Sequence, residues 1–175
     1  MASLLLTVIG DDRPGLVSAV ARLVEARGGS WQRSQMARLS GKFAGIALVD
    51  VPDGEVVTLE SALADLAVDG LQVRVERADA GEASGREVAD VHLHLLGQDR
   101  PGIVAEISAA LAARGVGIDE LSTDVREAPM AGGTLFEVDA RLSVPVDTDI
   151  VAVRGDLERL ADELMVDLRL DLPTA

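Results

Sequence analysis

The sequence has no cysteine, only one tryptophan and two phenylalanines as aromatic residues, and no long hydrophobic run. Without cysteine the chain cannot form disulfides, thiolate zinc sites or a cysteine nucleophile. So few aromatic rings cannot build the stacking platforms that bind bases. No stretch approaches the roughly 18 apolar residues of a membrane span, and residues 1–15 lack the basic flank and cleavage pattern of a signal peptide. We therefore expect a cytoplasmic protein that does not associate with membranes.

Basic residues are also scarce. The chain has 16 Lys and Arg against 30 Asp and Glu, a net charge of −14, which repels a phosphate backbone and argues against direct nucleic-acid binding. The excess is uneven, −3 for residues 1–79 and −11 for residues 80–175. A basic protein partner would therefore pair more favourably with the second half, although an acidic surface that only keeps the protein soluble explains the same charge. The positive charge of the first half includes Arg33, Arg38 and Lys42.

The 175-residue chain contains an internal repeat with an offset of 87 residues. It aligns LLLTVIGDDRPGLVSAVARLVEARG, from Leu4, with VHLHLLGQDRPGIVAEISAALAARG, from Val91. Each copy is much longer than a solenoid repeat, so each is expected to be a domain of its own. Apolar periodicity disappears between the copies, which predicts domains at 1–79 and 89–175 joined by a linker at 80–88.

Both copies have the same pattern of strand and helix signals. In copy one, strands are predicted over 4–9, 31–39, 43–51 and 71–75, with helices over 16–27 and 59–66. In copy two, strands are predicted over 91–96, 118–126, 134–144 and 166–172, with helices over 103–114 and 150–164, the last capped by Asp147 or Thr148. The order βαββαβ predicts an α+β protein of two ferredoxin-like domains, each a four-stranded antiparallel sheet with two helices on one face.

A βαββαβ unit whose first strand runs through G-x-D-R-P-G directly into a helix resembles the ACT domain, a regulatory module that binds small molecules. Two such units resemble the glycine cleavage system transcriptional repressor family of tandem ACT proteins. The resemblance covers nearly the whole chain, because the D-R-P-G loop occurs at equivalent places in both copies. It implies amino-acid binding at the loop between first strand and first helix, against a neighbouring ACT unit, with an effect on a partner protein.

The two loops are therefore the predicted ligand-binding sites. Their residues are Asp11, Asp12, Arg13, Pro14, Gly15, Leu16 and Val17 in copy one, and Gln98, Asp99, Arg100, Pro101, Gly102, Ile103 and Val104 in copy two. The glycines lack a Cβ and leave the backbone open to a ligand, and the amides of the first helical turn suit an α-carboxylate. Asp11, Asp12 and Asp99 are candidates for the ammonium group. The alternative is structural: the Asp caps the helix, and the Pro starts it.

The histidines do not indicate a catalytic or metal centre. His92 and His94 lie two apart on one strand, so both face the same side of the sheet, but no third ligand follows in sequence. They align with Leu5 and Thr7 in copy one. No nucleophile elbow accompanies them. We therefore expect no catalytic residues, no metal and no cofactor.

The resemblance to tandem ACT proteins, together with these observations, implies a non-enzymatic regulatory protein that binds a small amino acid, glycine or similar, and acts through a protein partner, a regulator or an enzyme. Transcriptional regulation of amino-acid metabolism is one expected output, and a homodimer is the expected assembly. Two alternatives remain open: a ligand-independent regulatory subunit of a metabolic enzyme, and a catalytic βαββαβ protein.

Overall fold

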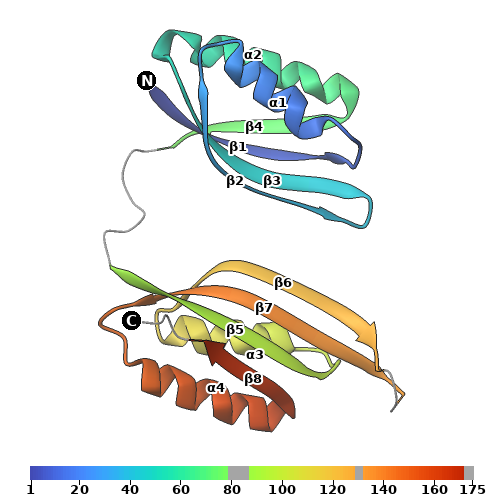
Figure 1. The fold of residues 1–175 in the computed structure, drawn as a ribbon, viewed down its shortest axis with the longest axis vertical. Helices are drawn as coiled ribbons and strands as arrows, with labels where there is room; N and C mark the ends of the chain where they lie inside the picture. The colour runs from blue at the N-terminus through green and yellow to red at the C-terminus, as the bar shows by residue number, and fades with distance from the viewer. Residues whose placement is uncertain (79–86, 129–131, 172–175) are drawn as a thin grey trace. The chain divides into compact units, whose positions relative to one another are not determined.

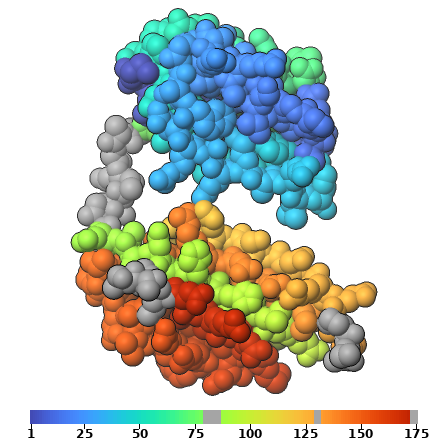
Figure 2. Space-filling view, in the orientation of Figure 1, coloured from blue at the N-terminus to red at the C-terminus, as the bar shows by residue number. Residues whose placement is uncertain are grey.

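The computed structural model describes residues 1–78, 87–128 and 132–171. The chain divides into two compact units, Met1–Glu82 and Ala83–Ala175, drawn as ribbons in Figure 1. Figure 2 shows their packed side chains, from blue to green in the first unit and from yellow-green to red in the second. The expected linker at 80–88 lies largely outside the described residues, and Val88 already begins a strand.

The first unit has the element order β1 (Ala2–Asp11), α1 (Leu16–Glu25), β2 (Ser30–Leu39), β3 (Lys42–Val51), η1 (Asp53–Glu55), α2 (Val56–Asp65), η2 (Leu66–Asp69) and β4 (Leu71–Arg77). The second has β5 (Val88–Gln98), α3 (Ile103–Ala113), β6 (Gly117–Glu127), β7 (Thr134–Pro145), α4 (Ile150–Leu164) and β8 (Val166–Asp171). None of the helices in the described part of the chain has the length and apolar composition of a membrane span.

Each unit is a four-stranded antiparallel sheet with two helices on one face (Figure 1), which confirms the predicted fold class. The strand orders are β2-β3-β1-β4 and β6-β7-β5-β8, so the first strand of each unit is central and its second strand lies at an edge. The two central pairs are in the same register, because Gly10 pairs with Phe43 as Gly97 pairs with Phe136. Equivalent positions in the two units can therefore be identified from strand pairing.

Alternation along the strands places the two cores under the helices. In the first unit, Leu4, Leu6 and Val8 of β1 are at most 1% exposed, and α1 contributes residues at helical spacing. Burying such side chains stabilises each unit by about 1.5–3 kcal/mol apiece relative to exposure. The second core is built likewise, from β5, β7 and the inner faces of α3 and α4.

The cap of α4 differs from the prediction. Asp149, not Asp147 or Thr148, is the N-cap, and its carboxylate accepts from the amides of Val151 and Ala152 at 3.0 and 3.2 Å. The helix begins at Ile150, so only Asp149 can reach the second and third amides of the first turn.

We expect Gly155→Ala to stabilise the protein by about 0.5–1 kcal/mol, because glycine inside a helix loses more backbone entropy on folding than alanine does. Gly155 lies in the middle of α4, and a Cβ built there meets nothing within 4 Å. Urea denaturation of both proteins measures the difference. An unchanged or lower stability would contradict the expectation.

Candidate functional site

The first D-R-P-G loop leads from β1 into α1 and leaves the helix without a side-chain cap. Gly15 is the N-cap residue, with φ 95°, and no side chain bonds to the first amides. The helical bonding begins with the Ala19 amide donating to the Gly15 carbonyl at 2.9 Å. The amides of Leu16, Val17 and Ser18 therefore precede the hydrogen-bonded ladder. Asp12, the cap in the structural alternative, therefore does not cap the helix.

Backbone conformation explains why glycine stands at this position. Gly15 and Gly102 have φ of 95° and 100°, a region that other residues rarely adopt. Pro14 precedes the cap and does not start the helix, since α1 begins at Leu16. The glycines are thus required for the turn itself, and replacing them would test the fold as much as any ligand.

The loop borders an open hollow of about 530 Å³. It is lined by Asp12, Arg13, Pro14, Gly15, Leu16, Val17, Ser18, Arg38 and Phe43. Arg38 comes from the edge strand β2, and its guanidinium lies 3.3 Å from the Asp12 carboxylate. One wall of the hollow is therefore a cation and an anion side by side, next to uncapped amides that attract negative charge.

Other contacts hold the loop in place. The Asp12 amide donates to the Gly41 carbonyl at 2.9 Å, and the Arg13 guanidinium donates to the Asp69 carbonyl at 2.6 Å. Asp11 does not line the hollow. Its carboxylate accepts a hydrogen bond from Lys42, which lowers the pKa of Asp11 below its usual value. Arg13 and Asp11 thus anchor the loop between the turns on either side.

The second loop has the same backbone but different charges. Gly102 is the N-cap of α3, again without a side-chain cap, and the Glu106 amide donates to the Gly102 carbonyl at 2.9 Å. Glu106 places a carboxylate in the first turn, 3.8 Å from the guanidinium of Arg100, whereas α1 has no acidic residue there. Val125 pairs with Phe136 as Arg38 pairs with Phe43, so Val125 is the equivalent of Arg38 in the second unit.

The remaining predicted residues divide by burial. Leu16 and Ile103 are 5% and 2% exposed, so their side chains belong to the two cores and only their amides are available. Val17 and Val104 are 44% and 39% exposed at the surface of each first helical turn. Asp99 donates its amide to the Thr134 carbonyl at 2.9 Å, and Pro101 precedes the cap as Pro14 does. Gln98, at the end of β5, is exposed.

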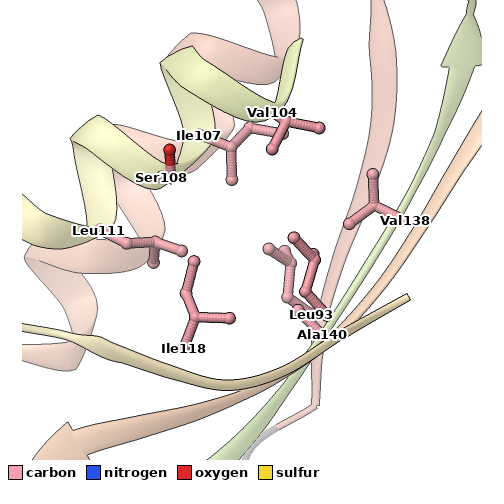
Figure 3. Close-up of a pocket in the computed structure, with 9 residues that line it drawn as sticks. Leu93, Val104, Ile107, Ser108, Leu111, Ile118, Val138 and Ala140 are labelled. Atoms are coloured by element: carbon pink, nitrogen blue, oxygen red, sulfur yellow. The ribbon is translucent and has the colours of Figure 1, made fainter. Parts of the chain in front are cut away.

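An apolar depression lies elsewhere in the second unit, between α3 and β6 (Figure 3). Its lining residues are Leu93, Val104, Ile107, Ser108, Leu111, Ile118, Leu121, Val138 and Ala140. The hydroxyl of Ser108 donates to the Ala105 carbonyl of its own helix at 3.1 Å. This depression offers no charged group to a zwitterion and does not resemble the hollow beside Arg38.

Sequence reasoning did not identify Arg38, Ser18 and Phe43 as part of the site. Arg38 lies 26 residues beyond Asp12 on another strand. The available signal was charge: Arg38 and Lys42, two of the basic residues of the first half, pair with the consecutive acids Asp12 and Asp11. Between the predicted strands 118–126 and 134–144, the segment EAPMAGG (127–133) predicts a longer loop than the turn of copy one, and its residues 129–131 lie outside the described part of the chain.

A family model described as ACT domain matches residues 2–76 and 90–171. A solved structure of an unknown protein from Galdieria sulphuraria is 32% identical, with a TM-score of 0.87 and coverage of 99% of both chains. A second structure, of a candidate glycine cleavage system transcriptional repressor, is 20% identical, with a TM-score of 0.73, covering 99% of this chain and 98% of that one, and shows the shared fold. The search of curated proteins gave no match.

Proposed function

The chain belongs to the ACT domain family, and we propose from this that it is a non-enzymatic regulatory protein that binds a small amino acid at the D-R-P-G loop of its first unit. The observation that carries the proposal is the hollow in which the uncapped start of α1 lies beside the Arg38–Asp12 ion pair. Glycine, or an amino acid of similar size, is the proposed ligand.

The charges of the ion pair are complementary to those of an amino acid. An α-amino acid carries a carboxylate next to an ammonium, and the hollow presents the Arg38 guanidinium next to the Asp12 carboxylate. Arg38 is 73% exposed and its single contact with Asp12 measures 3.3 Å, so exchanging that contact for a ligand carboxylate costs little. The released Asp12 can then accept from the ammonium group, while the amides of the first turn complete the carboxylate site.

The second loop is less suited to this ligand. Glu106 places a negative charge at the start of α3, where the ligand carboxylate would bind. Val125, at the position of Arg38, offers no compensating cation. We therefore propose one amino-acid site per chain.

The output is proposed to pass through a protein partner, with transcriptional regulation of amino-acid metabolism as one form and a homodimer as the assembly. The outer face of the first sheet supports this part of the proposal. Ile9 and Ile46 are 48% and 43% exposed there, beside the partly buried Leu5 and Leu48, and apolar surface of this kind is common where proteins associate.

Calorimetric titration of the full chain with a panel of small amino acids tests the binding. We expect one site per chain, and a loss of about 10–100-fold in affinity for Arg38→Gln, because hydrogen bonds to charged groups contribute about 1.5–3 kcal/mol. Arg33→Gln is the matched control, because Arg33 lies on the same strand but pairs with Leu48 on the outer face. Equal affinity in the wild type and Arg38→Gln would show that the amino acid does not bind in this hollow. No binding by any amino acid would favour a ligand-independent regulatory subunit.

A further inference from the structure

We propose that the outer face of the second sheet carries a binding site for a divalent transition-metal ion such as zinc, formed by His94, Glu137 and Asp139. His94 lies on β5, and the two acids lie two residues apart on the neighbouring strand β7. One ligand atom from each of the three residues lies within 4.8 Å of the others. Sequence spacing could not show this arrangement, because β7 is brought beside β5 only by the fold (Figure 1).

The distances fit coordination. His94 and Asp139 are direct partners across the antiparallel strands, and His94 Nδ1 lies 3.0 Å from Asp139 Oδ1. In tetrahedral coordination, two ligand atoms that each lie about 2.0–2.2 Å from one ion are separated by about 3.3–3.6 Å, so this pair must open by about 0.3–0.6 Å to hold an ion. Glu137 supplies the third ligand by a side-chain movement. Its Oε1 lies 3.8 Å from Nε2, the other ring nitrogen of His94, and one ligand atom of each of the three residues lies within 4.8 Å of the others.

The setting also favours a specific ion. His94 and Glu137 are 35% and 24% exposed, and both stand on central strands whose backbones are fixed by hydrogen bonding on both sides. One imidazole with two carboxylates is a donor set suited to zinc and neighbouring transition ions more than to magnesium or calcium, which prefer oxygen alone.

The fold itself does not require these three residues. Strand pairing places Thr7, Ala44 and Ile46 of the first unit at the positions of His94, Glu137 and Asp139. The first unit therefore forms the same sheet without any metal-ligating side chain at these places. The cluster is a feature of the second unit alone.

Nearby cations define a sharper test. Arg126 pairs with Glu137 at 3.1 Å and competes with an incoming ion for that carboxylate. Arg141 is engaged by Glu120 at 2.6 Å, and Arg169 stands opposite His94 on β8. Removing the Arg126 charge should therefore raise the affinity of this site for the metal. Weak zinc binding by carboxylates elsewhere on the surface would not change with Arg126.

The experiment is a zinc titration of the metal-free full chain by calorimetry, with the imidazole resonances followed by NMR. The chain has only two histidines, so His92, exposed on the same face, is an internal control. We expect one zinc per chain, a shift of the His94 resonances, and a tighter site in Arg126→Gln. His94→Asn should weaken binding by more than the roughly 10–100-fold that loss of an outer-shell partner costs, whereas His92→Asn should leave it unchanged. Absence of zinc binding, or wild-type affinity in His94→Asn, would overturn the proposal.

Discussion

Gly97→Ala should lower the free energy of unfolding by about 1–3 kcal/mol or more, as expected when a side chain is forced into a closely packed site. A Cβ built on Gly97 would lie 2.2 Å from Cγ1, 2.8 Å from Cβ and 3.0 Å from Cα of Val166. Side-chain rotation could relieve only the first of these contacts. Strand β8 would have to move away from β5, which disturbs the pairing between Gly97 and Val166. Thermal denaturation followed by circular dichroism measures the loss, with about 4–8 °C expected per kcal/mol for a unit of this size.

Gly54→Ala is the matched control for this substitution. Gly54 lies in η1, and a Cβ there meets nothing within 4 Å. The stability of the Gly54→Ala protein should therefore stay close to that of the wild type. Gly10→Ala is the equivalent change in the first unit, where the new Cβ would lie 2.6 Å from the Gly70 carbonyl oxygen, and it should destabilise as well. Wild-type stability in Gly97→Ala would show that the two strands separate at little cost.

These contacts explain the glycines of the repeated G-x-D-R-P-G pattern. The first glycine, Gly10 or Gly97, permits the last strand of the unit to approach closely. The second, Gly15 or Gly102, adopts a positive φ at the helix start. Both therefore have structural reasons that hold without a ligand. The evidence for a binding site comes instead from the uncapped amides and from Arg38.

The fold was predictable because its determinants are local and occur twice. Residues such as Leu4, Leu6 and Val8 alternate along a strand that becomes central, and Leu16, Val20 and Val24 follow helical spacing. The predicted strands 31–39 and 43–51 are separated by Ser40, Gly41 and Lys42, a spacing typical of a hairpin, and Ser40 and Gly41 form its turn with positive φ. The cap of α4 was misplaced because neighbouring polar residues compete, and only the helix start at Ile150 decides among them.

The charges of the site were less predictable, since they depend on contacts between distant residues. The Arg38–Asp12 pair joins an edge strand to a loop 26 residues away, and the His94–Asp139 pair joins residues 45 apart. Alignment of the copies at the offset of 87 residues already places Gln98 against Asp11, Glu106 against Ala19 and Val125 against Arg38. The structure was needed to show that position 38 lies beside the loop and that position 106 lies in the first helical turn.

Ala19→Glu should weaken amino-acid binding at the first loop by at least about tenfold, because two like charges about 4 Å apart repel by about 4 kcal/mol near a protein surface. Ala19 and Glu106 are equivalent, since each donates its amide to the N-cap glycine at 2.9 Å. The Glu106 carboxylate lies 3.2 Å from the Cβ position of Gly102. A glutamate at position 19 would therefore place its charge beside Gly15, where the ligand carboxylate is proposed to bind. Calorimetry with the amino acid that binds the wild type measures the change.

Stability separates this effect from damage to the fold. An acidic residue near a helix N-terminus contributes about 0.3–1 kcal/mol in its favour, so Ala19→Glu should unfold no earlier than the wild type while it binds more weakly. Ala19→Gln has the same length without the charge and should keep most of the affinity. An equal loss in both variants would assign the effect to steric obstruction. Unchanged affinity in Ala19→Glu would show that the amides at the start of α1 do not receive the carboxylate, because a ligand carboxylate bound there would be repelled by the new negative charge.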